Sequence, residues 1–260
     1  MNAIESKERV DSYLDRSRTS RFTFQQYNIT FRMVQKKIVE FFKDDVEEVR
    51  KYLYTLKTDV TPTITTLSTT TNYIISHINY PSDYYYFQVM NIFIDGVLSE
   101  VTPTDDDQLN RQLQNTYTSP TNKYIFQRED ATGWKVYRGT TGTPTCELTY
   151  LKTPSDFYIG NESNLINEGT AVLALLTSYT VVEQSVYNGV TYNPGDTFTT
   201  NGVLADLTSG QVILTSVLAD SNLPEQVQEK MCWVVAEILS GNISDFNKSQ
   251  FVEKELLKSS

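Results

Sequence analysis

Residues 58–72 read TDVTPTITTLSTTTN and divide the chain into a helical part before them and a β-rich part after them. Pro62 cannot continue a helix, because its ring removes the backbone donor and clashes with the preceding turn. Thr dominates the segment, and its branched Cβ favours extended backbone. The chain of 260 residues holds 33 Thr and 17 Tyr, mostly after this segment begins, so strands are expected through its middle.

Upstream of this segment, apolar residues recur at helical spacing. A short helix is expected over residues 6–16, and Thr23 is placed to cap a longer one over residues 24–57. Its apolar stripe comprises Phe24, Tyr27, Phe31, Val34, Ile38, Phe41, Val49, Tyr52 and Leu56. The spacing skips at Asp45, so two helices that break near residues 43–45 are also compatible with it. The stripe fits packing within the chain's own core, and equally a strut that also contacts neighbouring subunits.

Downstream, alternating and β-branched segments predict an antiparallel β-rich region. Strands are expected at residues 73–78, 84–94, 124–126, 134–137 and 146–151. Asp95-Gly96 is typical of a tight hairpin turn, and the loop at residues 138–144 is interpreted as a second hairpin loop. Between them, Thr104 is expected to cap a short helix that begins with three acidic residues and ends near Asn115.

Residues 155–220 predict a separate small β module. Asn188-Gly189 is a strong hairpin signal, and turn residues recur every 8 to 10 positions over residues 169–218. Helical patterns return after Pro224, with Val227, Met231, Val234, Val235 and Ile238 forming an apolar stripe. A last helix is expected from about residue 244. The helices at the two ends of the chain each carry a stripe that the other can bury, so they are expected to pack together.

These patterns predict an α+β fold. The N- and C-terminal helices pack together, and the central antiparallel β-rich region is followed by an inserted small β-barrel or sandwich. The expected divisions are residues 1–58 (N-terminal helices), 59–154 (β-rich region with one short helix), 155–220 (inserted β module) and 221–260 (C-terminal helices).

Composition excludes several classes of function. One His and two Cys are too few for a structural zinc or iron–sulfur site, so neither a metal nor a cofactor is expected. A formal net charge of −10 argues against a protein whose main partner is nucleic acid, because phosphate binding needs basic surface. The charged N-terminal stretch lacks the apolar core of a signal peptide, and no apolar run is long enough to span a membrane. A soluble protein made in a cytoplasm is expected.

Catalytic patterns are scarce. His77 is the one imidazole and lies in an expected strand, where a half-buried structural histidine is the plain interpretation. Cys146 and Cys232 lie far apart in sequence, with no neighbour that would activate a thiolate. No Gly-x-Ser-x-Gly nucleophile motif is present. The chain is therefore expected not to be an enzyme.

Two groups of residues are candidates for interactions. Tyr84, Tyr85 and Tyr86 alternate across an expected strand, so at least one is expected on the surface, where Tyr favours protein contacts and also stacks on sugars. The expected last helix carries Phe246, Phe251, Leu256 and Leu257, which are candidates for docking to a partner.

Three segments follow an order that resembles a known family. They are YPSDYYYF at residues 80–87, DDDQLNRQLQNTYTSPTNKYIF at 105–126 and CELTYLKTP at 146–154. Their key residues are Pro81, Asp83, Tyr84, Asn115, Pro120, Tyr150, Leu151, Lys152 and Pro154. The order resembles the head-to-tail connector proteins in the neck of tailed bacteriophages of the crAss-like group. The segment YNGVTYNPGDTF at residues 187–198 is similar to small β modules of phage structural proteins.

The resemblance implies a non-enzymatic subunit of a homo-oligomeric ring of about twelve copies. Its expected partners are itself, the portal protein and neighbouring neck or tail ring proteins, with DNA only as passing cargo and no membrane. The protein would be made in the host cytoplasm and reside in the neck of the virion. The acidic charge suits a channel through which DNA slides. The alternative function is a carbohydrate- or surface-binding β protein of a virion or cell surface.

Overall fold

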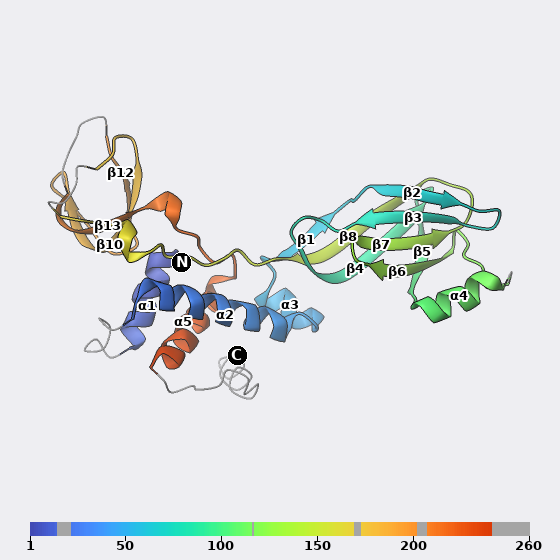
Figure 1. The fold of residues 1–260 in the computed structure, drawn as a ribbon, viewed down its shortest axis with the longest axis horizontal. Coiled ribbons are helices and arrows are strands. Elements are labelled where there is room, and N and C mark those ends of the chain that lie inside the picture. Colours follow the sequence, from blue (N-terminus) through green and yellow to red (C-terminus); the bar gives the residue numbers. More distant parts are fainter. Residues whose placement is uncertain (15–21, 116, 169–172, 202–206, 241–260) are drawn as a thin grey trace. The chain divides into compact units, whose positions relative to one another are not determined.

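The structure is a computed structural model that describes residues 1–14, 22–115, 117–168, 173–201 and 207–240. The chain forms two compact units, drawn in Figure 1. Met1–Thr55 and Pro154–Ser260 make up the first, here called the helical unit, and Leu56–Thr153 make up the second, the β unit. The β unit thus interrupts the sequence of the helical unit. Residues 155–220, expected as an insertion, belong to the same unit as the terminal helices.

The helical unit is built around helices from both ends of the chain. They are α1 (Ala3–Tyr13), α2 (Phe24–Phe42), α3 (Val46–Tyr52) and α5 (Glu225–Leu239). Both α1 and α2 pack against α5, which confirms that the terminal helices bury each other's apolar stripes. The expected last helix lies outside the described residues.

Local capping explains where α2 begins and why it ends before α3. The Thr23 side chain accepts a hydrogen bond from the Gln26 backbone amide, and the Gln26 side chain accepts one from the Thr23 backbone amide. Asp45 caps α3, so the long helical pattern breaks near residue 45. The predicted stripe was wrong at Phe41, which is 38% exposed, because the buried row continues from Ile38 by one full turn to Phe42.

An extended strap over residues 155–160 runs along α2. Asn28 donates to the Gly160 carbonyl at 3.0 Å and accepts from the Ile159 amide at 2.8 Å. Gln35 donates to the Ser155 carbonyl at 2.9 Å. Because these two side chains are seven positions apart, they lie on one face of α2, and the strap packs against that face.

The small β module folds around its own core within the helical unit. Its strands are β9 (Leu165–Asn167), β10 (Ser178–Tyr187), β11 (Val190–Tyr192), β12 (Thr197–Thr199) and β13 (Leu207–Leu214). The order is β11-β10-β13-β9, and β12 also pairs with β10. Asn188 and Gly189 both have positive φ, which confirms the predicted hairpin between β10 and β11. Strand β10 runs unbroken from Ser178 to Tyr187 and contains register shifts where it pairs with β13.

The β unit contains a curled sheet of eight strands (Figure 1). They are β1 (Lys57–Val60), β2 (Ile64–Thr69), β3 (Ile74–Asn79), β4 (Tyr84–Ile94), β5 (Val97–Pro103), β6 (Tyr124–Asp130), β7 (Gly133–Arg138) and β8 (Pro144–Lys152). The order is β1-β8-β4-β5-β6-β7-β3-β2, so the Thr-rich segment supplies both edge strands. The expected antiparallel pattern holds except between β5 and β6, which are parallel.

Each face of this sheet has its own apolar cluster. One cluster contains the fully buried residues Ile78, Ile92, Ile125, Val136, Cys146 and Leu148 together with Trp134. The other lies under α4 (Asp106–Gln114), where Leu109 packs with Phe126 and Tyr137. Asp105, and not Thr104, caps α4, because its carboxylate accepts from the Gln108 amide at 2.8 Å. Thr104 donates instead to the Gln127 carbonyl.

The loop at residues 138–144 is not a hairpin loop, so that prediction is wrong. Strand β7 pairs with β6 and β3, whereas β8 pairs with β1 and β4. The loop therefore carries the chain between strands that are not neighbours. The Arg138 guanidinium stabilises the conformation of the loop. It donates to the carbonyls of Gly139, Thr141 and Gly142, each at 3.3 Å.

Candidate interaction surface

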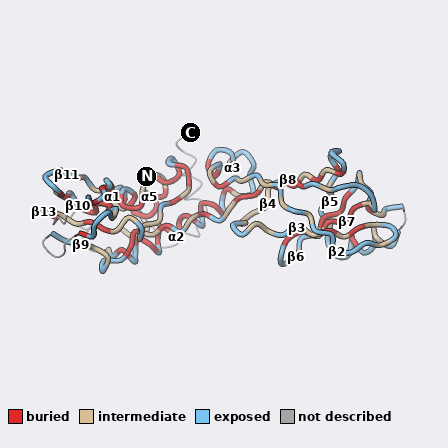
Figure 2. Tube along the Cα trace, turned by 90° about the horizontal axis from the view of Figure 1, so that it is seen from above, coloured by how far each residue is buried: buried red, intermediate tan, exposed pale blue. Residues whose placement is uncertain are grey.

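One face of α2 is exposed although it carries two large apolar residues. Ile29 is 59% exposed, and Met33, one turn later, is 38% exposed. Lys36 and Lys37 continue the same face and are also exposed. Buried residues of α2 alternate with these along the helix (Figure 2) and face α5 and the strap. We call this apolar and basic face, residues Ile29, Met33, Lys36 and Lys37, the α2 surface.

An acidic and equally exposed segment follows where α2 meets α3. Asp44, Asp45 and Glu47 are exposed, and Val46 among them is 57% exposed. The Asp45 carboxylate caps α3 by accepting hydrogen bonds from the backbone amides of Glu47 and Glu48, at 2.8 and 3.2 Å. We call residues Asp44–Glu47 the α3 surface. It combines one apolar side chain with three carboxylates.

The two surfaces are complementary in charge and both include exposed apolar side chains. Lys36 and Glu47 form no ion pair with any residue that the structure describes. Two different complementary surfaces on one chain allow a head-to-tail contact between copies, which closes into a ring when the rotation permits. In such a contact the apolar side chains supply affinity, and the charges at the rim fix the register.

The three predicted tyrosines of β4 are half-buried and have different surroundings. Tyr84 stacks on Tyr80 with ring centroids 4.5 Å apart and meets the edge of Trp134 at 5.3 Å. Burial raises the pKa of Tyr84 to about 12. Tyr85 and Tyr86 are also half-buried, at a register shift between β4 and β8. Tyr84 is therefore part of an aromatic cluster of the β unit.

The predicted C-terminal residues Phe246, Phe251, Leu256 and Leu257 lie outside the described residues. Their proposed role in docking stays a prediction.

Two of the motifs that carry the family resemblance meet in the structure. The Tyr150 hydroxyl donates to the Asp83 carboxylate at 2.6 Å, and the Thr153 amide donates to the Asp83 carbonyl at 2.7 Å. The third motif closes α4, where the Asn115 side chain accepts from the Tyr117 amide at 3.0 Å. The motif residues thus hold β4 to β8 and shape the end of α4.

His77 lies in β3 beside a small polar cluster. Its Nε2 is 3.5 Å from the Asp130 carboxylate and 3.3 Å from the Thr132 hydroxyl. The amide of Thr132 donates to Asp130 at 2.9 Å and, as the main cause, holds the pKa of Asp130 well below its usual range. Lys135 completes the cluster at 3.3 Å from Asp130. The arrangement ties the β6–β7 turn to the neighbouring strand.

Both thiols are buried. Burial raises the pKa of Cys146, in the core of the β unit, to about 12. Burial raises the pKa of Cys232, on α5, to about 12 as well. Both side chains are therefore protonated at neutral pH and pack as small apolar groups.

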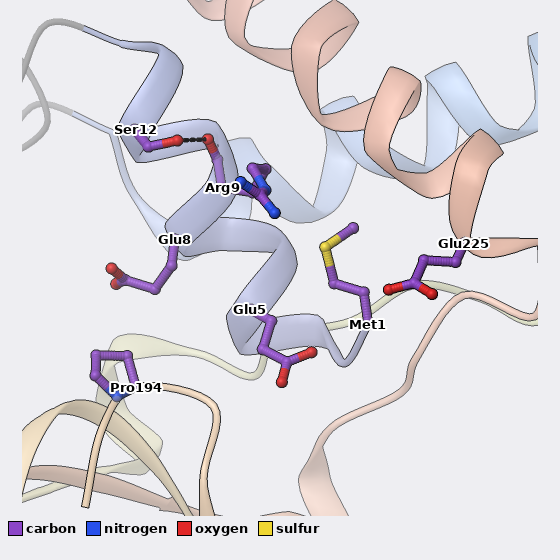
Figure 3. Close-up of a pocket in the computed structure, with 7 residues that line it drawn as sticks. All are labelled: Met1, Glu5, Glu8, Arg9, Ser12, Pro194 and Glu225. Carbon is purple, nitrogen blue, oxygen red and sulfur yellow. Dashed lines mark hydrogen bonds between the residues drawn. The ribbon is translucent and has the colours of Figure 1, made fainter.

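A hollow of about 520 Å³ lies beside α1 and is lined by Met1, Glu5, Glu8, Arg9, Ser12, Pro194 and Glu225 (Figure 3). Its polar groups already hold the fold together. Glu5 accepts from the Asn2 amide at 2.7 Å, and the Asn2 side chain donates to the Gly195 carbonyl at 2.8 Å. Arg9 forms an ion pair with Glu229 of α5 at 3.8 Å. The hollow thus marks where α1, the small β module and α5 join.

Comparison of the chain with models of known protein families and with curated protein sequences gave no match. Within the described ranges, no three His, Cys, Asp or Glu side chains are grouped so that they could hold a metal ion. None of the helices described is both long and apolar enough to cross a membrane.

The α2 and α3 surfaces were not predicted from the sequence. The predicted helical stripe marks the buried face of α2, whereas Ile29, Met33 and Val46 fall outside that stripe. The sequence signal that could have revealed these surfaces is a set of large apolar residues outside the stripe, followed by the acidic residues at 44–47.

Proposed function

We propose that this chain is a non-enzymatic structural subunit of a homo-oligomeric ring. The observation that carries the proposal is the pair of exposed surfaces on the helical unit, the apolar and basic α2 surface and the apolar and acidic α3 surface. The α2 surface of one copy contacts the α3 surface of the next. Because the two surfaces differ, each copy offers one of each, and the contact repeats around a ring.

The apolar residues make the contact favourable. Covering a side chain the size of Ile or Met stabilises by about 1.5–3 kcal/mol relative to full exposure. Ile29 and Met33 are only partly exposed, so each contributes less than this. A ring multiplies the modest gain, since every copy makes the contact twice.

The order of sequence motifs supports placing the ring in the neck of a tailed bacteriophage, between portal and tail. In this function the ring joins the portal protein to the neighbouring neck or tail ring and lets DNA pass. The net charge of −10 agrees with a conduit that does not retain DNA, because acidic surface repels phosphate.

Light scattering and negative-stain electron microscopy of the full chain test this function, alone and mixed with a portal protein from a crAss-like phage. Rings, or decoration of the portal by many copies, are expected. A chain that stays monomeric both alone and with the portal contradicts the proposal.

A further inference from the structure

A second hollow lies wholly within the β unit, at one end of the curled sheet, and has a volume of about 510 Å³. This size falls in the range of small-molecule sites in proteins. Its walls come from β4, β6 and β7 and from the start of α4. The residues that decide its chemistry are Phe87, Asp105, Gln108, Gln127, Glu129 and Trp134.

Gln127 lies on the core-facing side of β6, where an apolar side chain is expected. Residues alternate between the faces of a strand, so Gln127 shares its face of β6 with Ile125, which is part of the core. Gln127 is only 7% exposed, yet its side-chain amide forms no hydrogen bond with any described residue. The Gln127 amide atoms are not among the fully enclosed unpaired side-chain atoms, and Gln127 lines the hollow, so its amide is open there to a hydrogen-bonding ligand.

The aromatic wall of the hollow is held in place by the cluster behind it. Phe87 is half-buried and packs on Trp134 with ring centroids 5.8 Å apart. Tyr80 meets Trp134 edge-on at 4.6 Å. The Tyr80 hydroxyl donates to the Glu129 carboxylate at 2.5 Å, which also fixes this acid at the rim. The wall is therefore rigid before any ligand arrives, which lowers the entropic cost of binding.

The charges of the lining disfavour anions, because its carboxylates repel them. Asp105 and Glu129 contribute carboxylates, and none of the described residues that line the hollow is a Lys, Arg or His. Arg128, next in sequence, pairs with Asp106 at 2.7 Å. Asp105 and Glu129 each accept one hydrogen bond from the chain and retain capacity for more, because a carboxylate has about four acceptor sites.

We propose that this hollow is a binding site for a neutral, hydroxyl-rich ligand, a saccharide. The Gln127 and Gln108 amides can both donate to and accept from hydroxyl groups, and the carboxylates accept from them. The half-buried Phe87 ring offers an apolar surface to the C–H face of a sugar ring. Saccharide binding would be a second function besides ring assembly, and it does not depend on the proposed ring contact.

Intrinsic fluorescence tests the site directly, because the chain has two Trp and one of them lines the hollow. In the full-length Trp233→Phe variant, Trp134 is the sole indole. The probes are glucose, galactose, mannose, N-acetylglucosamine, rhamnose and their short oligomers at millimolar concentration. At least one is expected to change the Trp134 emission saturably, with calorimetry confirming the affinity.

Substitutions in the same background separate the site from other effects. Gln127→Leu and Glu129→Gln are each expected to weaken binding about tenfold, because the first removes a hydrogen-bond partner of the sugar and the second replaces a charged acceptor with a weaker neutral one. Gln108→Ala, on the exposed side of α4, gives a variant that keeps the core intact if Gln127→Leu unfolds. Gln184→Leu, on β10 in the helical unit, is the matched control and leaves binding unchanged.

Three results overturn the proposal. The first is that no saccharide in the panel changes the fluorescence or gives heat. The second is that binding survives Gln127→Leu, Glu129→Gln and Gln108→Ala unchanged. The third is that the hollow binds N-acetylarginine amide and no saccharide, which would assign it to a cationic side chain of a protein partner.

Discussion

The backbone amide of Lys152 donates to the carbonyl of Leu56 at 2.9 Å, which joins the two ends of the β unit. The pairing continues into the sheet, where Lys57 on β1 lies opposite Leu151 on β8. The chain thus enters and leaves the β unit at adjacent points. Adjacent ends are the arrangement expected of a domain inserted into a loop of another.

This closure predicts that residues 56–153 fold on their own. They contain a complete sheet and both of its apolar clusters, so the isolated fragment is expected to unfold cooperatively on heating. The remaining chain, with a short Gly-Ser linker in place of these residues, is expected to keep its helices. Circular dichroism during thermal unfolding measures both. A fragment that shows no cooperative transition contradicts the division into two units.

Gly133 has no room for a side chain. A Cβ at this position would lie 2.0 Å from the Ile78 carbonyl oxygen on the neighbouring strand. Gly133→Ala is therefore expected to lower the free energy of unfolding of the β unit by about 3 kcal/mol. Gly96→Ala is the matched control, since Gly96 also has positive φ but open space around it, and about 1 kcal/mol is expected there. Chemical denaturation of the isolated β unit measures the free energy of unfolding of both variants. If Gly133→Ala loses no more stability than Gly96→Ala, the neighbouring strand can move to admit the methyl group at no cost, which contradicts the prediction.

The tyrosines of the β unit predict sensitivity to alkali. Burial raises the pKa of Tyr84 and of Tyr150 to about 12, above the ordinary value of 10.0. A raised pKa in the folded state gives stability that is complete below pH 10 and is lost as the pH rises toward 12. Phenolate absorbance and circular dichroism are expected to change together in this window. Tyr84→Phe removes one of these groups and is expected to move the alkaline midpoint upward; an unchanged midpoint would argue against the link.

The α2 surface is expected to matter for assembly and not for folding. Ile29→Asp and Met33→Asp replace exposed side chains, so the free energy of unfolding is expected to change by less than about 0.5 kcal/mol. Both substitutions are expected to reduce the assembled fraction in sedimentation velocity. Val190→Asp, at a residue of β11 that is 52% exposed, is the control and is expected to assemble normally. Assembly that tolerates both α2 substitutions would exclude this surface.

Local signals in the sequence were enough for much of the fold. Caps and turns involve residues within four positions of each other, which is why the Thr23 cap and the Asn188-Gly189 turn could be predicted directly. The helix break that Asp45 caps was only one of two alternatives. Strand partners are set by contacts far apart in sequence. Strand β7 pairs with β3 about sixty positions earlier, so the pairing of β7 with β8 was wrongly expected.

The candidate sites were harder to predict for a related reason. Helical spacing shows which residues can share a face, but it cannot show which neighbouring element covers that face. Phe41 was assigned to the core, whereas the fold buries Phe42 and leaves Phe41 partly exposed. Gln127 carries no signal in the sequence, because its significance comes from a core-facing position that only the assembled sheet defines.

The central claim is that copies associate through two different surfaces of opposite charge. Two charge-reversal variants test it. The first is Lys36→Glu with Lys37→Glu on the α2 surface, and the second is Asp44→Lys with Glu47→Lys on the α3 surface. Each variant alone brings like charges together in every contact, so neither is expected to assemble. Thermal unfolding of each one alone checks that both remain folded.

When the two variants are mixed in equal amounts, every contact in an alternating ring again joins opposite charges. Mass photometry of the mixture, under the conditions in which the unmodified chain assembles, is the most direct measurement. The proposal predicts that the mixture regains the ring mass while each variant alone stays small. A mixture that stays small, or variants that assemble alone as well as the unmodified chain, would contradict it.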